Sequence, residues 1–207
     1  FLKMTECARK NNVSFMEAML PTTSPNFSII RRNLSRLGRI RRYFAAYCQY
    51  SSRYDKLQQG DAANVFRTSM SGGATMDIGV YTIYPMVALF GMPQSINAQG
   101  IILSGGVDGQ AAVNMTYPDM NATVVYSKIA DSYLPSEIEG EKGNLLMSGI
   151  HVIHDVTFIP HRKPMSGQGP EEERQAVGVE IDKSDYFYET AEFIDLVEKG
   201  KSESENN

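Results

Sequence analysis

The sequence has few of the features that mark secreted, metal-stapled or membrane proteins. Its two cysteines, Cys7 and Cys48, stand alone without paired spacing, so we predict neither a disulfide framework nor a cysteine metal site. No apolar run approaches the roughly 18–20 residues of a membrane span, and no charged-then-apolar leader opens the chain. These absences predict a soluble globular chain in the reducing cytoplasm, with no membrane partner.

The chain also lacks the short motifs that bind nucleotides or present common nucleophiles. It contains no G-x-G-x-x-G, no P-loop and no G-x-S-x-G. His151 and His154 are three residues apart in a segment that we predict as a strand, so they would point to opposite faces. No clustered cysteine or acidic residue completes a set of ligands around them. We therefore predict no metal site.

The charge balance argues against nucleic acid as a partner. Lys and Arg number 20 against 24 Asp and Glu, which gives a net charge of -4. One basic cluster departs from this average, namely Arg31, Arg32, Arg36, Arg39, Arg41 and Arg42. It is either an anion-binding patch or a solvated helix end and strand start offset by the acidic tail. The second interpretation is favoured, because no aromatic or Gly-rich nucleic-acid motif accompanies the arginines.

A length of 207 residues allows one large domain, or one domain and part of another. The first eleven residues have helical spacing, and 13–19 (VSFMEAM) is typical of a short buried strand stopped by Pro21. A helix followed by a buried strand is the rhythm of a parallel α/β sheet. This rhythm is cut off at its start, so the chain opens like the last piece of something larger.

The rest of the pattern predicts an α+β domain with a large open, mainly antiparallel sheet backed by helices. We expect helices at 24–37, 74–90 and 184–199, a loop at 51–71, a loop at 162–174 and a frayed end at 201–207. We expect strands at 40–50, 96–103, 111–117, 123–129, 137–140, 145–147, 152–159 and 176–181. Most of these strands follow one another through short turns, which is typical of antiparallel pairing.

The most informative segment is the start of the 74–90 helix. Asp77, Tyr81 and Tyr84 are spaced i, i+4 and i+7, so they share one face of an otherwise apolar helix. Gly72 and Gly73 would let another backbone or a flat ligand approach the helix start. The stripe either lines a cleft and performs acid–base chemistry, or it packs in the core with hydrogen-bonded partners. A tyrosine that transfers a proton near neutral pH would need a nearby cation to lower its pKa from about 10.

A second candidate site is QYSSRYD at 49–55, where a strand gives way to a loop. Tyr50 and Arg53 lie in this segment. Strand ends of this kind commonly supply substrate contacts, and equally often they are plain turn residues. Both interpretations stay open.

Several motifs together carry a family resemblance. SGGATMDIGVYTIY resembles the GG-x-x-x-D-x-G-x-[HY] helix motif of the glucose–fructose oxidoreductase/inositol dehydrogenase/MocA (Gfo/Idh/MocA) family. VSFMEAML is similar to the last strand of that family's Rossmann domain, and FAAYCQYSSRYDK to a strand of its dihydrodiol-dehydrogenase-like branch. EIEGEKG and YFYETAEFIDLVEKG resemble a later strand turn and the closing helix. The resemblance runs from Phe1 to about Gly200.

The resemblance implies two domains with separate roles. An N-terminal Rossmann domain would bind NAD or NADP, and 1–20 would be its last helix and strand. Residues 21–200 would form the C-terminal domain, which shapes the site for a sugar, polyol or dihydrodiol-like substrate and makes a homo-oligomer through its open sheet face. Tyr81 would then be the catalytic acid/base and Asp77 the carboxylate that orients substrate. Tyr50, Arg53 and Gly73 would contact substrate.

The sequence also departs from the family pattern. The Gly-rich fingerprint and the Glu-Lys-Pro motif, whose lysine supports the tyrosine, would both lie before Phe1. After MEAM the family often has an aromatic residue and an arginine, where this chain has Leu20-Pro21-Thr22-Thr23. The cofactor-binding residues are therefore unknown, and we expect the chain alone to bind no nicotinamide and to be inactive. The alternative is a non-catalytic dimerising or ligand-binding module derived from such an enzyme.

Overall fold

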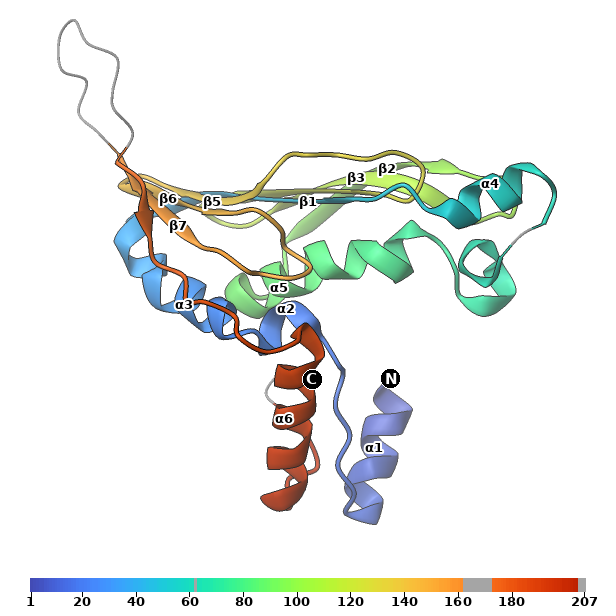
Figure 1. Cartoon of the computed structure of the whole chain (residues 1–207), viewed down its shortest axis with the longest axis horizontal. Coiled ribbons are helices and arrows are strands. Elements are labelled where there is room, and N and C mark those ends of the chain that lie inside the picture. The colour runs from blue at the N-terminus through green and yellow to red at the C-terminus, as the bar shows by residue number, and fades with distance from the viewer. Residues whose placement is uncertain (62, 162–172, 205–207) are drawn as a thin grey trace, which may run out of the picture.

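The computed structural model describes residues 1–61, 63–161 and 173–204 and contains, in these ranges, an eight-stranded sheet with helices on one side (Figure 1). The strand order is β2-β3-β4-β1-β5-β6-β7-β8. Neighbouring strands are antiparallel except β1 and β4, which are parallel. The strands are β1 (Ile40–Cys48), β2 (Ser95–Ile102), β3 (Asp108–Thr116), β4 (Asn121–Ser127), β5 (Ser136–Gly140), β6 (Gly143–Met147), β7 (Thr157–Pro160) and β8 (Gln175–Ala176). The predicted α+β fold with a mainly antiparallel sheet is confirmed.

The helices lie mainly along one face of this sheet. They are α1 (Leu2–Asn11), α2 (Leu20–Thr23), α3 (Pro25–Asn33), α4 (Ser52–Gln58), α5 (Val80–Phe90) and α6 (Asp185–Glu198), with short turns η1 (Leu34–Leu37), η2 (Asn64–Phe66) and η3 (Thr68–Met70) and the π-helical turn η4 (Thr75–Gly79). Within the described ranges no helix is both long and apolar enough to cross a membrane.

The core lies between the sheet and the helices α3 and α5. Alternate residues of β1, among them Tyr43 and Ala45, point toward the helices and are fully buried. Phe27 of α3 and Met86 of α5 meet them from the other side. The hydroxyl of Tyr43 donates to the backbone carbonyl of Thr82 at 3.0 Å, so this buried polar group is satisfied. Each large apolar side chain buried here contributes about 1.5–3 kcal/mol relative to exposure.

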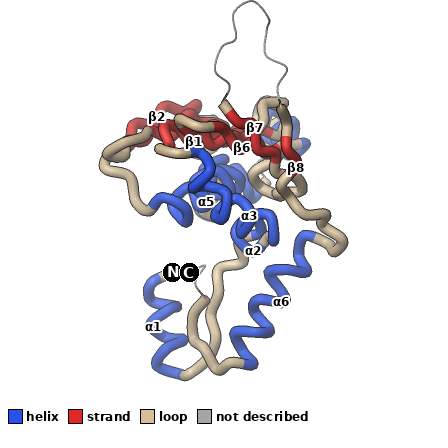
Figure 2. The backbone as a smooth tube through the Cα atoms, turned by 90° about the vertical axis from the view of Figure 1, so that its left-hand side faces the viewer, coloured by secondary structure: helices blue, strands red, loops and turns tan. Residues whose placement is uncertain are grey.

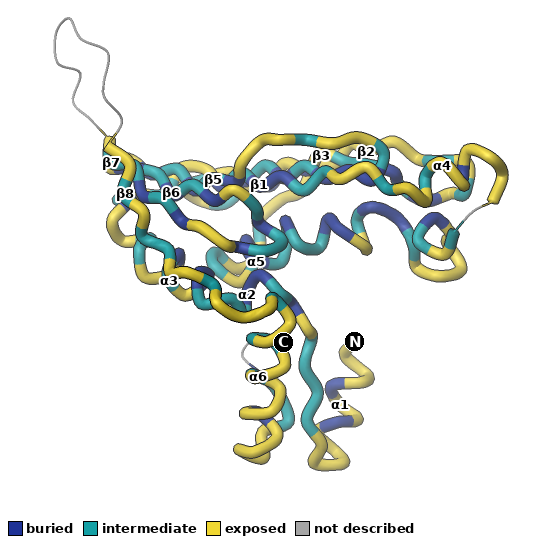
Figure 3. Tube along the Cα trace, viewed as in Figure 1, coloured by how far each residue is buried: buried dark blue, intermediate teal, exposed yellow. Residues whose placement is uncertain are grey.

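The two ends of the chain meet away from the sheet. α1 and α6 project on the same side of it, beyond α2 and α3 (Figures 1 and 2). Phe15, in the predicted strand 13–19, is extended but forms a single parallel bridge, to Glu203. The predicted strand is thus reduced to one bridge, because the described residues offer it no neighbouring strand. Most of α6 is exposed (Figure 3).

The C-terminal segment corrects one prediction. Residues 201–204, which we expected to be frayed, are held: the Phe15 amide donates to the Ser202 carbonyl at 2.9 Å, and Arg9 pairs with Glu203. The remainder of that predicted tail, 205–207, lies outside the described residues.

Three further predictions need correction. The predicted loop 51–71 contains α4, η2 and η3, because Leu57 and Phe66 bury their side chains against Val107 in a small second core. The predicted strands 152–159 and 176–181 shrink to β7 and β8, since β8 finds partners only at Thr157 and Phe158. Most of the predicted loop 162–174 lies outside the described residues.

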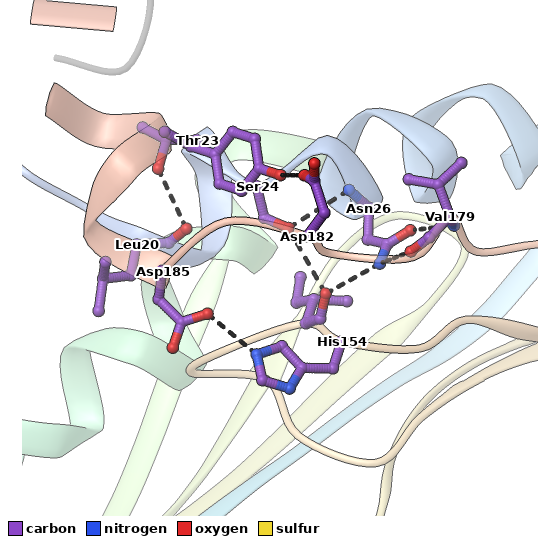
Figure 4. A network of polar contacts seen from close by, with 10 residues as sticks. Leu20, Thr23, Ser24, Asn26, His154, Val179, Asp182 and Asp185 are labelled. Carbon is purple, nitrogen blue, oxygen red and sulfur yellow. Dashed lines mark hydrogen bonds and ion pairs between the residues drawn. The ribbon is translucent and has the colours of Figure 1, made fainter. Parts of the chain in front are cut away.

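A buried amide ties together the segments that lead to α6 (Figure 4). Asn26 is fully buried, and its Nδ2 donates to the carbonyls of Ile153 and Val179, each at 3.0 Å. Its Oδ1 accepts from the Val179 amide at 2.7 Å. Close by, His154 Nε2 lies 2.9 Å from Asp185 Oδ1 at the first turn of α6. The start of α3, the loop before β7 and the chain entering α6 therefore form one connected unit.

Candidate functional site

The predicted acid–tyrosine helix begins on the sheet itself. The backbone amide and hydroxyl of Thr75 donate to Asp108 Oδ2 at 2.7 and 2.8 Å, and the same hydroxyl lies 2.8 Å from the hydroxyl of Tyr126. Asp108 opens β3 and Tyr126 belongs to β4, so two strands fix the first turn. An acidic residue that accepts from the first amides of a helix acts as its N-terminal cap.

Two glycines make this close docking possible. Gly73 has φ +122°, and a Cβ on it would collide with the Asp108 carboxylate. A Cβ on Gly79 would lie 3.0 Å from the ring of Tyr126. Gly73, which we expected to contact substrate, is buried beneath the first turn, with the Asp108 side chain close to it.

The side chains of Asp77 and Tyr81 both reach the edge of the core. η4 has π-helical geometry, which is frequent at functional sites, and α5 continues from it without a break. The side chain of Asp77 is 40% exposed, and Tyr81 is half-buried. Burial raises the pKa of Tyr81, with a further increase from the charge of Asp77 and smaller ones from Glu189, Tyr186 and Glu17. The phenol therefore carries its proton at neutral pH.

Lys128 is the partner of Asp77, and sequence reasoning missed it. Its Nζ forms an ion pair and hydrogen bond with Asp77 Oδ2, and its side chain is only 9% exposed. Lys128 follows β4, where Ala122, Val124 and Tyr126 all point to the helices. The same alternation places position 128 on the side of the sheet that faces the helices, so the lysine there is the sequence signal from which this partner of Asp77 could have been predicted.

A second pair of rings adjoins Tyr81. Tyr47 of β1 meets Tyr81 edge to face, with centroids 6.0 Å apart, and stacks on His151 at 4.0 Å. Burial raises the pKa of Tyr47 and lowers the pKa of His151, so both rings are neutral at neutral pH. Tyr47 and His151 also line a cavity of about 350 Å³ with Gln49 and Ser148. Tyr84, the third predicted stripe residue, is half-buried, and burial raises its pKa, with a further increase from the charge of Glu17.

Tyr50 and Arg53 lie beside this site without joining the Asp77–Lys128 pair. The hydroxyl of Tyr50 donates to Asp55 at 2.6 Å, and Arg53 is exposed at the start of α4. The link to the site is through the backbone, because the Ser51 amide donates to the carbonyl of Lys128 at 2.9 Å.

The remaining polar candidates serve the fold. Of the basic cluster, Arg41 pairs with Glu141 and Arg42 with Glu139, which favours the interpretation as a solvated strand start. His151 and His154 lie in an irregular loop rather than in the predicted strand. Over the described ranges, no three His, Cys, Asp or Glu side chains group as metal ligands.

The start of the acid–tyrosine helix does not fit the pyrophosphate of a dinucleotide. A pyrophosphate binds free amides at a helix N-terminus, usually after a Gly-rich loop. Here the Thr75 amide is already taken by the Asp108 carboxylate, whose charge would repel a phosphate. The carboxylate of Asp77 and the phenol of Tyr81 are groups that form hydrogen bonds with hydroxyls.

An open, mainly antiparallel sheet with helices on one face defines this chain as an α+β domain. The chain belongs to the GFO/IDH/MocA family: the family model for the GFO/IDH/MocA C-terminal domain matches residues 33–146. The resemblance inferred from the motifs is thereby confirmed.

Two curated relatives are similar over much of the chain. It is 41% identical over 205 residues to scyllo-inositol 2-dehydrogenase (NADP(+)) IolU of Bacillus subtilis (strain 168), a match covering 99% of this chain and 60% of that protein. It is 42% identical over 159 residues to the uncharacterized oxidoreductase YgjR of Escherichia coli (strain K12), covering 77% of this chain and 48% of that protein. The matches thus cover only about half to three fifths of these relatives.

The fold recurs in solved structures. Levoglucosan dehydrogenase in complex with NADH and L-sorbose superposes with a TM-score of 0.72 at 16% identity, covering 92% of this chain and 58% of that chain. KijD10, a 3-ketoreductase from Actinomadura kijaniata, in complex with NADP and TDP-benzene, gives 0.71 at 18% identity, covering 94% and 57%. At this identity the likeness establishes the shared fold.

Proposed function

We propose that this chain supplies the substrate side of an oxidoreductase that transfers hydride between NAD or NADP and a carbon bearing a hydroxyl or carbonyl group in a sugar, polyol or dihydrodiol-like substrate. One observation carries the proposal: a lysine-paired carboxylate, Asp77, lies one turn from a protonated phenol, Tyr81, at the edge of the core. The names of the similar dehydrogenases, for scyllo-inositol and levoglucosan, support the substrate class.

The roles follow from the chemistry of each group. Asp77 accepts a hydrogen bond from a substrate hydroxyl and so orients the ring that carries it. Tyr81 holds a proton at Oη for the reacting oxygen. Its pKa is raised by burial and by the charge of Asp77, so transfer of that proton near neutral pH requires a cation from outside the described residues, the role that the family resemblance gives to the lysine of the Glu-Lys-Pro motif. We assign Tyr50 and Arg53, beside the strand end of Lys128, to outer substrate contacts. Gly73 is buried against Asp108 and its amide and carbonyl are bonded to Val65 and Asp77, so we assign it to the close approach of the Asp108 side chain at the helix start, without a contact to substrate.

The electrostatics favour a neutral substrate. Glu17 and Glu189 both act on Tyr81 from outside its own helix, and both disfavour its ionisation. An anionic substrate would meet the same repulsion, whereas the hydroxyls of a polyol would find acceptors. This supports an uncharged sugar or cyclitol over a sugar acid.

The cofactor would be held by residues outside this site. In support, the match covers 60% of IolU, and α6 exposes large apolar side chains, including Phe187, Ile194 and Val197, that a further domain would cover. We therefore propose that the chain alone binds no nicotinamide and is inactive. Two free cysteines, Cys7 and Cys48, support a reducing cytoplasmic location.

The test is binding of scyllo-inositol to the purified chain by titration calorimetry, in the absence of nucleotide. Asp77→Asn should weaken binding by about tenfold, since a charged acceptor is worth about 1.5–3 kcal/mol. Tyr117→Phe is the matched control, because its hydroxyl donates to the Gly91 carbonyl at 2.8 Å and faces another part of the fold. Wild-type affinity in Asp77→Asn would contradict the assignment.

The inactivity of the chain alone has its own assay. The chain with NADP⁺ and scyllo-inositol should give no turnover above background. Turnover that Tyr81→Phe abolishes would overturn the proposal that the cofactor is held elsewhere.

The second candidate function is a non-catalytic dimerising or ligand-binding module. One observation favours it, because the sheet face opposite α3 and α5 carries half-buried apolar side chains, Phe44, Val125 and Leu146. Self-association together with polyol binding unaffected by Asp77→Asn would favour this module over the enzyme.

A further inference from the structure

Lys128 is held rigidly at the end of β4. Its amide donates to the Gly109 carbonyl at 2.8 Å, and its carbonyl accepts from the Ser51 amide at 2.9 Å. The inward alternation of β4 then directs the side chain toward η4, where Nζ meets Asp77 Oδ2. The sheet, rather than a flexible surface loop, therefore positions this ammonium beside η4.

The pair has an unequal exposure that suits a binding site. Lys128 is 9% exposed at its side chain, whereas Asp77 is 40% exposed. The ammonium of Lys128 therefore contacts the Asp77 carboxylate from its buried side. The exposed part of the Asp77 side chain remains within reach of a hydroxyl from solvent.

The negative charges around Tyr81 indicate an electrostatic role for Lys128. Tyr81 feels negative charge from Asp77 on η4, from Glu189 on α6 and from Glu17 in the segment before α2, and it lies near the phenols of Tyr186 and Tyr47. Lys128 is positioned to offset the nearest of these charges. Without it, the carboxylate would be free to rotate, and the site would become more negative.

We propose that Lys128 is a positioning residue of this site: its ammonium fixes the Asp77 carboxylate for a substrate hydroxyl and balances its charge beside Tyr81. The inference rests on the proposed function, because it assigns Asp77 to substrate. It predicts that Lys128 acts entirely through Asp77 and never contacts substrate.

A double-mutant cycle on scyllo-inositol binding tests this dependence. Lys128→Met, which keeps length and bulk, should weaken binding by about tenfold. Lys128→Arg should restore affinity to within about threefold of wild type, since it returns the charge and the donors. In an Asp77→Asn background, Lys128→Met should cause no further loss, because the group it positions is already altered. Equal losses in both backgrounds, or wild-type affinity in Lys128→Met, would overturn the proposal.

The charge of Lys128 predicts a change in ligand preference that a purely structural role of this residue would not produce. Lys128→Met should shift preference from scyllo-inositol toward an amino-cyclitol, in which one hydroxyl is replaced by an ammonium group. A uniform loss for both ligands would indicate mere unfolding of the site and would count against the proposal.

The ion pair can be observed without any substrate. In a ¹H–¹⁵N correlation spectrum of lysine side chains, the wild-type chain should show one slowly exchanging ammonium that disappears in Asp77→Asn. A spectrum without it would overturn the positioning role. If the wild-type chain showed this signal and bound no polyol, the proposed substrate class would fail while the Lys128–Asp77 pair stood.

Discussion

The imidazole of His151 lies flat on the phenol ring of Tyr47, with 4.0 Å between the ring centroids and 5° between their planes. The stack joins the irregular loop before β7 to the strand that faces Tyr81. Because the imidazole is partly buried between these elements, its pKa is lowered from the ordinary value of 6.5. The neighbouring Asp185 opposes this effect and His154 adds to it.

The buried imidazole predicts a loss of stability in mild acid. An unfolded chain takes up a proton at this position near pH 6.5, whereas the folded chain resists it to lower pH. The unfolded state therefore binds more protons, and the contribution of the neutral ring is present above about pH 6.5 and is lost as the pH falls toward the folded pKa. His151→Phe keeps a ring on Tyr47 and should flatten this dependence between about pH 5.5 and 7.5, measured by urea unfolding.

The matched control for this prediction is His161→Phe, which removes an exposed imidazole. Its slope of unfolding free energy against pH, measured alongside, is the reference for a His-to-Phe change at an exposed position. The same slope in His151→Phe and in the wild type would show that His151 is not the group responsible.

The cap at the start of η4 gives a prediction about stability. Asp108→Ala removes the acceptor of two Thr75 hydrogen bonds in a partly buried place. It should lower the free energy of unfolding by about 2–3 kcal/mol, since hydrogen bonds to charged groups are the stronger ones. Asp119→Ala is the control, because the recorded contact of Asp119 uses its backbone carbonyl, which accepts from Arg41. Equal stability of the two variants in denaturant unfolding would contradict the role of the cap.

The nearness of Asp77 to Tyr81 could be predicted from the sequence, because both lie on one helix, where spacing determines which side chains are neighbours. Lys128, the ion-pair partner of Asp77, could not be predicted in this way. It is 51 residues away from Asp77 in sequence, and only the sheet topology brings it there. Likewise, the hydrophobic pattern of 74–90 predicts a helix but does not distinguish a π-helical turn from an α-helical one.

The strands β2, β3 and β4, whose predicted ranges agree with the structure, each pair with a neighbour along their whole length. The segment 13–19 has the composition of a strand, yet a strand is defined by its partners, and here Phe15 has a single bridge. The loop 51–71 failed for the opposite reason. Its short helices are stabilised by tertiary burial of Leu57 and Phe66, which local propensity does not reveal.

The amide of Asn26 should be the most sensitive polar group near α6. Asn26→Ala leaves the carbonyls of Ile153 and Val179 and the Val179 amide without their buried partner (Figure 4). We expect a loss of about 3 kcal/mol or more, because each abandoned buried group costs about 1–3 kcal/mol. Asn97→Ala, at an exposed position of β2, serves as the control. Similar unfolding midpoints for the two variants would contradict the role of this amide.

The bare sheet face predicts self-association. Val125 of β4 lies on this face with Ala46 and Ala112 as its cross-strand neighbours, beside a groove of about 440 Å³. Small and apolar side chains flanked by polar rows suit a face that packs against a second copy of itself. The resemblance to the Gfo/Idh/MocA family implies the same use of the sheet. We therefore expect light scattering after gel filtration to give a multiple of the 23.0 kDa chain mass.

A charge at the centre of this face should separate the copies. Val125→Lys would bury an unpaired ammonium in the assembled interface, which is costly, but would leave it solvated in the monomer. We expect the variant to elute as a monomer whose thermal midpoint does not depend on protein concentration, whereas the midpoint of the self-associating wild type rises with concentration. Gln58→Lys, on exposed α4, adds the same charge elsewhere and should keep the wild-type assembly. A monomeric wild type would refute the predicted self-association. A Val125→Lys variant that still associates would place the interface on another surface.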